Sequence, residues 1–329
     1  MLNFFKKQNI LTHDGKFHAD DVFSVATLSI LNDGKIKITR SRNPETIEKF
    51  LKAGDIIVDN GRDYNPEKNI FDHHQEGGAG VRESGVPYAG FGLIWKHFGR
   101  QVCLKEIKKQ NSEFKKAEEN KTADELNLNE TVEYVWQQVD SGIVSNIDAT
   151  DTGYTDYYSE KTHSSAFAPD KIVGSFVPNW REDYAEADKI FANLSKAAEI
   201  LIKREIKVSY DRFLAKNIIE ETYQNSPDKR LIIFKRGYPW KEILVEKPEP
   251  LYVVFPTINN DGWMVQAVPV KKDSQEVRKP FPQSWRGKTD SELEKVSGVK
   301  SAKFCHNAGF LAGAHDFEGI KQLAQKALD

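Results

Sequence analysis

The chain has 329 residues and a mass of 37.5 kDa, about twice the length of a common single domain, which predicts two domains. Apolar residues form 39% and charged residues 29% of the sequence, which excludes a wholly disordered chain, and no apolar run approaches the roughly 18 residues of a membrane span. Two cysteines argue against a disulfide framework or a cysteine-based zinc site, and a net charge of −2 excludes a chain that is basic throughout. Because no secretory signal pattern opens the sequence, we expect a cytoplasmic protein without a membrane partner.

The first half alternates short apolar strands with helical segments. In chain order, the predicted elements are an apolar stretch at 10–11, a buried helix at 20–31, a strand at 35–39, a helix that begins at Asn43-Pro44 and ends at Gly54, and a strand at 55–59. This strand–helix–strand order predicts an α/β domain with a mainly parallel sheet. The loops that follow the strands are then expected to carry the functional site.

The second half begins with a long helical stretch and continues with shorter elements. Its predicted elements are one or two helices over 179–221, a break at Asn225-Ser226-Pro227-Asp228, strands at 231–234, 251–255 and 263–270, and a terminal helix at 316–328. We therefore predict three parts: an N-terminal catalytic domain at 1–185, a helical connector at 186–225 and a smaller α/β domain at 226–329.

Histidines and acids gather first on the predicted loop between the opening strand and helix. His13, His18 and Asp20 lie within eight positions of one another, so a turn can bring them to one centre. Imidazole together with carboxylate suits manganese, zinc or iron better than calcium. The alternative is that Asp20 and Asp21 only favour the first turn of the helix and the histidines are incidental.

Two further clusters carry acids. Asp72-His73-His74-Gln75 precedes a glycine-rich stretch, and Asp59 ends a buried strand, where a carboxylate needs a partner. The alternative is that Asp59 is only a turn residue before Asn60-Gly61. Asp148 and Asp151 lie three apart and share a helix face, with an Asx turn before Gly153 as the alternative.

These clusters resemble the four motifs of the DHH phosphoesterase superfamily. The residues of these motifs are most similar to those of the melanocyte-proliferating-gene (MYG) exonuclease family. Trp285-Arg286-Gly287 and the stretch from Phe304 to Phe310 resemble the C-terminal motifs of that family. The likeness runs from Thr12 to Leu328. The elements that carry it in the first half are His13-x4-His18-x-Asp20, Val58-Asp59, Asp72-His73-His74-Gln75 and Ile147-Asp148-Ala149-x-Asp151-x-Gly153.

The resemblance implies a two-domain phosphoesterase of DHH type that acts on RNA or short oligonucleotides from the 3′ end. It also implies two manganese ions in the first domain, a second domain that holds the substrate phosphate, and an active site in the cleft between them. The first motif departs from the superfamily pattern, because His18 stands where an acid is usual. Metal identity and ligand number therefore stay open.

The same resemblance suggests roles for individual residues. Asp59 is the expected bridging ligand and a catalytic residue, Asp72 is expected to orient a ligating imidazole, and His74 to meet the substrate phosphate. The further metal ligands are expected to be His13, His18, Asp20, His73 and Asp151, with Asp148 in reserve. The expected phosphate-binding residues are the cations Arg286, His306 and Arg82, with Gly309 and Gly313 allowing close approach of the backbone.

Two other functions stay open. A small-molecule phosphoesterase would cleave a cyclic dinucleotide, pyrophosphate or a nucleotide bisphosphate with the same metal chemistry. A metal-bound regulatory protein would hold the ions without turnover. The sequence also leaves a homo-oligomer open.

Overall fold

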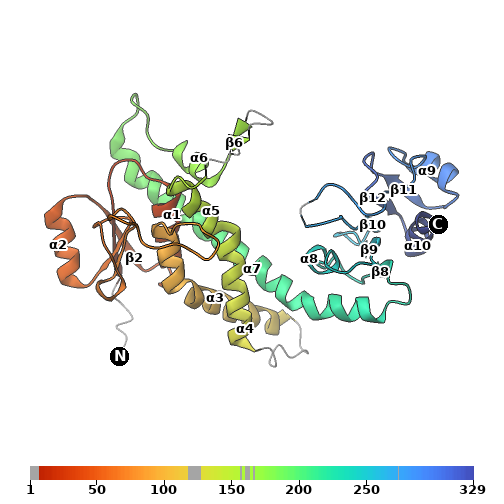
Figure 1. Ribbon diagram of the computed structural model, residues 1–329, viewed down its shortest axis with the longest axis horizontal. Helices are drawn as coiled ribbons and strands as arrows, with labels where there is room; N and C mark the ends of the chain where they lie inside the picture. Colours follow the sequence, from red (N-terminus) through yellow and green to blue (C-terminus); the bar gives the residue numbers. More distant parts are fainter. Residues whose placement is uncertain (1–6, 118–126, 156–157, 160–163, 166, 273) are drawn as a thin grey trace. The chain divides into compact units, whose positions relative to one another are not determined.

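The computed structural model describes residues 7–117, 127–155, 158–159, 164–165, 167–272 and 274–329 (Figure 1). The chain divides into two compact units, Met1–Tyr210 and Asp211–Asp329. The long helix α7 (Ala187–Asn225) contributes residues to both units, in the stretch where the sequence predicted a helical connector. Among the described residues, no helix combines the length and apolar character needed to cross a bilayer.

The N-terminal unit contains a five-stranded sheet in the order β2-β1-β3-β5-β4. The first four of these strands are parallel, and β4 pairs antiparallel with β5 at the edge. This arrangement confirms the predicted α/β class with a mainly parallel sheet. The strands are β1 (Gln8–Thr12), β2 (Ile36–Arg40), β3 (Ile56–Val58), β4 (Tyr64–Asn65) and β5 (Ile70–Phe71).

Helices follow the strands of this unit. Helix α1 packs against α3 and is buried along its length from Ala19 to Ile30, so its apolar side chains are not confined to one face and its few polar ones are buried as well. The helices are α1 (Ala19–Leu31), α2 (Pro44–Ala53), α3 (Gly90–Ala117), α4 (Leu128–Val139), α5 (Ser145–Asp151) and α6 (Pro169–Gly174), with short turns η1 (Pro66–Lys68), η2 (Asp140–Val144) and η3 (Tyr184–Glu186) and the hairpin β6 (Tyr158–Ser159) and β7 (Ser164–Ser165).

Helix α2 shows why local sequence predicts its ends well. The Asn43 side chain accepts hydrogen bonds from the backbone N–H groups of Glu45 and Thr46, and Pro44 occupies the first helical position. Gly54 ends the helix with a φ of 67°, a left-handed conformation that glycine adopts without strain. The structure confirms the predicted start and end of this helix.

The C-terminal unit contains a second five-stranded sheet, in the order β11-β12-β10-β9-β8. Its pairs are antiparallel except for β8 and β9. The sequence missed β11 and β12, which are short and lack β-branched residues. The elements are β8 (Leu231–Ile233), α8 (Lys241–Leu244), β9 (Tyr252–Pro256), β10 (Trp263–Ala267), α9 (Asp290–Ser297), β11 (Ala302–Cys305), β12 (Leu311–Ala314) and α10 (Phe317–Leu328).

Alternate residues of this sheet enter two separate apolar clusters. Tyr252 and Val254 pack with residues of α10, whereas Val253 packs with Ile219 of α7 and with Trp240. This is the period of two that a strand imposes on its side chains. On the second face, Met264 and Gln266 of β10 stay only half-buried, so the cover on that face is incomplete.

Candidate metal centre

Three neighbouring parallel strands of the N-terminal unit end at one edge of the sheet. His13 follows β1, Asp59 follows β3, and Asp72-His73-His74 follows β5, and these strands are adjacent in the order β1-β3-β5. Residues that follow the carboxyl ends of parallel strands share an edge of the sheet, which is where α/β proteins commonly bind ligands. The fold thus brings together clusters that lie far apart in the sequence.

Asp59 lies at the centre of this group. Its Oδ2 is 3.2 Å from Nε2 of His13, and its Oδ1 is 3.4 Å from Nε2 of His73 and 3.3 Å from Nδ1 of His74. The residue is 3% exposed and has a φ of 49°. Such a left-handed conformation is tolerated by Asp and Asn better than by most other residues.

The imidazole and carboxylate groups form three overlapping sets of candidate ligands. In each set, one potential ligand atom from every residue lies within 4.8 Å of the others. Asp59 belongs to two sets and His73 to two, so the sets form one continuous cluster. They are His13, His18 and Asp59; Asp59, Asp72, His73 and His74; and Asp20, His73 and Asp151.

Buried atoms of this cluster lack good hydrogen-bond partners among the described residues. They are Oδ2 of Asp21, Oδ1 of Asp59 and Nε2 of His73, although the last two lie only 3.4 Å apart. Buried polar atoms are normally satisfied, yet Oδ2 of Asp21 lies 3.3 Å from Nε2 of His13, and Nε2 of His73 lies 3.1 Å from Oδ2 of Asp151, without a well-formed hydrogen bond. Imidazole nitrogens and carboxylate oxygens in this arrangement fit a divalent transition-metal ion.

Without metal, the cluster balances its charge through protonated histidines. Burial opposes the charge on His73, but the carboxylates of Asp151 and Asp59, at 3.1 Å and 3.4 Å from its Nε2, raise its pKa to about 11. The nearby carboxylates of Asp59 and Asp72 raise the pKa of His74 to about 9. Burial alone would raise the pKa of Asp59, but its close contacts with the three imidazoles hold that pKa well below the usual range.

Asp72 holds the loop after β5 rather than the centre itself. Its Oδ1 accepts hydrogen bonds from the backbone N–H of His73 at 2.7 Å and lies 2.8 Å from Nδ1 of His74, while its Oδ2 accepts from the N–H of Arg62. The His74 side chain stays 57% exposed. Asp72 thereby fixes the imidazole of His74, which was expected to meet the phosphate, so its predicted role of orienting a ligating imidazole stays a prediction.

A pocket of about 620 Å³ opens beside the centre. Asp59, Asp72 and His74 line one part of it, and the cations Arg42 and Arg62 line another. Neither arginine was among the predicted site residues, because an arginine in a loop is ordinarily a solvated surface residue. Their position offers positive charge to an anionic substrate next to the centre.

Asp148 and Arg82 pair with each other instead of joining the three ligand sets. Nη1 of Arg82 lies 2.6 Å from Oδ2 of Asp148, and the same guanidinium bonds to Asp140. Oδ1 of Asp148 accepts a hydrogen bond from the backbone N–H of Gly92. Their roles in metal and phosphate binding stay predictions, and this geometry favours a buried structural ion pair.

Two further buried or half-buried acids beside the predicted ligands were not among the predicted site residues. Asp21 is fully buried, its Oδ2 lies 3.3 Å from Nε2 of His13, and burial raises its pKa to about 7. Asp170 accepts a hydrogen bond from the N–H of Ala19, which ties α6 to the start of α1. The adjacent Asp20-Asp21 pair could have indicated the first of these, whereas no local pattern marks Asp170.

The predicted phosphate-binding residues of the C-terminal unit meet around the turn between β11 and β12. Nε of Arg286 donates to the carbonyl of Phe281, and it lies only 2.6 Å from where a Cβ at Gly309 would stand. His306 is exposed in the same turn. Gly313 differs, because the ring of Phe304 lies 2.5 Å from where a Cβ at this position would stand. Phosphate binding by these residues stays a prediction, and the glycine at 313 serves packing.

Comparison with known proteins places the whole chain in one family. Residues 9–328 match the model of the MYG1_exonuc family, described as uncharacterised protein family UPF0160. The MYG1 protein C694.04c of Schizosaccharomyces pombe is 30% identical, with 97% of each chain covered. The mouse MYG1 exonuclease is 27% identical, with 99% of this chain and 86% of the mouse protein covered.

A solved structure, that of RecJ in complex with Mn2+ from Thermus thermophilus, aligns with 97% of this chain and 52% of its own. The identity is 13% and the TM-score is 0.27, too low for any conclusion about fold or function. The family match, in contrast, covers nearly the whole sequence, including the residues of the metal centre and of the β11–β12 turn. The chain therefore belongs to the MYG1_exonuc family.

Proposed function

We propose that this protein is a manganese-dependent phosphodiesterase that shortens RNA or short oligonucleotides from the 3′ end. The observation that carries the proposal is the shared carboxylate of Asp59, which belongs to two of the three candidate ligand sets. A carboxylate shared between two sets suits a site for two ions. The mammalian relatives named as exonucleases support the same class of reaction.

Each candidate ligand would have a defined role in metal binding. His13, His18 and Asp59 would hold one ion, and Asp20, His73 and Asp151 the other. The third set joins these two, because it contains both Asp59 and His73. Bound there, divalent ions supply a water of lowered pKa and neutralise charge on the phosphoryl group. Asp21 would keep the His13 imidazole in place from behind.

The substrate phosphate would enter from the pocket beside the centre. His74 reaches that pocket with an exposed side chain, and Arg42 and Arg62 lie on its wall. Positive groups aimed at a phosphoryl oxygen stabilise charge that develops in the transition state. His74 would bind and orient the phosphate there while Asp72 keeps its ring in place.

The first test uses metal-stripped protein to which manganese, magnesium or zinc is returned. Each form is incubated with 5′-end-labelled short RNA and, in parallel, with small phosphoesters. We expect manganese to restore stepwise shortening of the RNA, with the 5′ label retained on progressively shorter products. Loss of the label as a mononucleotide at the first step would reverse the proposed polarity.

Two other outcomes would replace the proposal. Hydrolysis of pyrophosphate, a cyclic dinucleotide or a nucleotide bisphosphate, with intact RNA, would move the function to small-molecule phosphoesterase. Bound metal with no turnover of any substrate would identify a regulatory protein.

Metal uptake is expected to release protons near neutral pH. His73, with a pKa of about 11, carries a proton in the metal-free cluster, and a ligating nitrogen must lose its proton. Because fewer protons remain to be displaced at higher pH, affinity for manganese should rise as pH increases. Calorimetric titrations in buffers of different ionisation enthalpy measure this release. A binding heat that is the same in every buffer would contradict it.

A further inference from the structure

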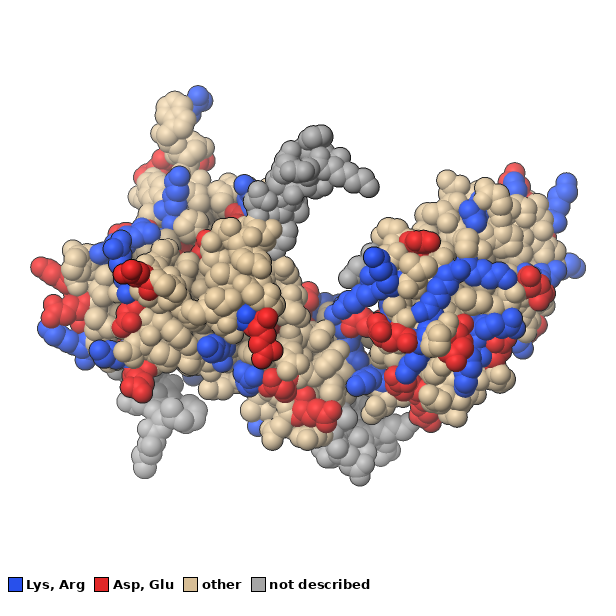
Figure 2. Space-filling view, in the orientation of Figure 1, with Lys and Arg blue, Asp and Glu red and all other residues tan. Residues whose placement is uncertain are grey.

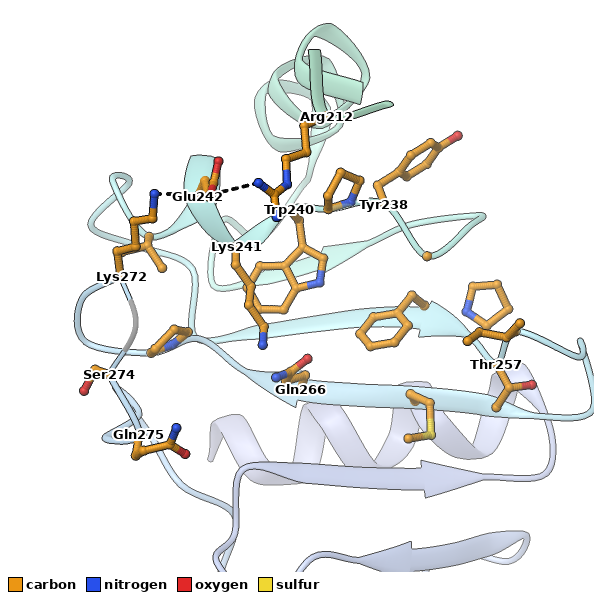
Figure 3. Close-up of a pocket in the computed structure, with 18 of the residues that line it drawn as sticks. Arg212, Tyr238, Trp240, Lys241, Glu242, Thr257, Gln266, Lys272, Ser274 and Gln275 are labelled. Atoms are coloured by element: carbon orange, nitrogen blue, oxygen red, sulfur yellow. Dashed lines mark ion pairs between the residues drawn. The ribbon is translucent and has the colours of Figure 1, made fainter. Parts of the chain in front are cut away.

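A pocket of about 950 Å³ lies in the C-terminal unit, over the face of the sheet that α10 does not cover (Figure 3). Its lining residues all come from the unit Asp211–Asp329. The volume is in the range of pockets that bind small molecules. None of the residues predicted for metal or phosphate binding lines it.

The floor of the pocket is aromatic and apolar. Trp240, Phe255 and Met264 line it, and Trp240 is 3% exposed while Phe255 and Met264 are half-buried. The two residues from the strands belong to β9 and β10, where the second face of the sheet lies open. Flat aromatic side chains that are partly accessible offer a surface on which a base can stack.

The rim of the pocket is cationic. Glu242 lies 3.8 Å from Arg212 and 3.3 Å from Lys272, and it is the one acidic side chain that lines the pocket among the described residues. Lys241 is exposed, and Figure 3 shows its side chain pointing into the pocket above Gln266. Three cations thus face one carboxylate, which leaves positive charge for a phosphate.

The charge of this pocket is local. Figure 2 shows Lys and Arg side chains over the visible face of the C-terminal unit with acidic side chains between them. A continuous basic surface would bind any polyanion, whereas this mixed surface directs a ligand to the places where stacking and charge coincide. The amide of Gln266 adds both a donor and an acceptor beside the aromatic floor.

We propose that this pocket binds an unpaired base of single-stranded RNA together with its neighbouring phosphate. The base would stack on Phe255 and meet Gln266 with its edge, and Lys241 would contact the phosphate. Single-stranded RNA is recognised in this way, by stacking and by hydrogen bonds to splayed bases. An apolar peptide would leave Lys241 and Gln266 without polar partners. The inference rests on the proposed function, since it takes this RNA to be the substrate.

The test measures binding without catalysis. Fluorescein-labelled oligo(A), oligo(U) and oligo(C) are titrated with the full chain in EDTA, and fluorescence anisotropy gives the dissociation constants. Phe255→Leu should weaken binding about 5- to 20-fold, in line with the loss of one base stack. Lys241→Ala should lower the slope of log K against log salt by about 0.7, as expected for one lost phosphate contact on a single strand. Gln266→Met should reduce the difference in affinity between the three homopolymers.

The matched control is Lys300→Ala, which removes an exposed lysine of the same unit outside the pocket and should leave binding unchanged. No binding by the wild type, or equal affinities for wild type, Phe255→Leu and Lys241→Ala, would overturn the inference. Manganese-dependent hydrolysis of bis(p-nitrophenyl) phosphate, which has no base, should be the same in all variants. Because binding is measured in EDTA, it can succeed or fail independently of RNA shortening.

Discussion

Replacing Asp59 by Asn should abolish metal-dependent phosphodiesterase activity while the protein stays folded. Asn keeps the size of the side chain and tolerates the left-handed backbone at this position, where φ is 49°. It removes the negative charge that lies within 3.4 Å of three imidazole nitrogens and that two candidate ligand sets share. We expect kcat to fall at least about 1,000-fold, which corresponds to about 4 kcal/mol of lost transition-state stabilisation.

Thermal unfolding separates this effect from a loss of fold. Manganese should raise the Tm of the wild type, because a ligand that binds the native state stabilises it, and should raise the Tm of Asp59→Asn much less. Asp63→Asn is the matched control, since Asp63 is an exposed acid four residues further along the same loop. It should match the wild type in both measurements. An Asp59→Asn enzyme with normal kcat would remove Asp59 from the centre.

Much of this centre could be predicted from the sequence because its residues follow strands. Asp59 directly follows the apolar run at β3, and Asp72 directly follows β5. In a parallel sheet, the ends of such strands meet whatever the length of the connecting chain. Local pattern therefore located residues that the fold brings together, although the pairing order of the strands is not written in any one segment.

The parts that escaped prediction depend on contacts between distant segments. In the sequence, Arg82 looks like an unpaired cation in a loop. In the structure, its guanidinium bonds to Asp148, 66 positions away. Asp20 was expected to be a ligand, yet nothing local shows that the N–H groups of Gly90 and Phe91 also bond to it. The pocket in the C-terminal unit likewise combines α7, the turn before α8 and two strands, none of which is distinctive alone.

The start of α3 binds two carboxylates beside the metal centre through its backbone N–H groups, and its glycines make this possible. The N–H of Gly92 donates to Oδ1 of Asp148 at 2.9 Å, and the N–H of Gly90 donates to Oδ2 of Asp20 at 3.0 Å. Backbone N–H groups at a helix start are free to bind carboxylates in this way. A carboxylate can approach so closely only because neither residue carries a Cβ.

Gly92→Ala should therefore destabilise the N-terminal unit. The added Cβ would stand 1.8 Å from Oδ2 of Asp148 and 2.7 Å from Nη2 of Arg82, so the buried ion pair must shift or break. Alanine favours a helix by about 1 kcal/mol over glycine, but overpacking and the disturbed buried pair outweigh this gain. We expect a net loss of about 2 to 4 kcal/mol in the free energy of unfolding.

Urea unfolding of metal-free protein measures the loss, and hydrogen exchange should show faster opening of α3 and α5 than of β8–β12. Gly142→Ala is the matched control, because Gly142 also lies in a helical segment but has no atom within 4 Å of its added Cβ. That variant should be as stable as the wild type or more so. An unchanged urea midpoint for Gly92→Ala would mean that Asp148 and Arg82 move aside without a loss of stability. The ion pair would then not be what holds α5 against the start of α3.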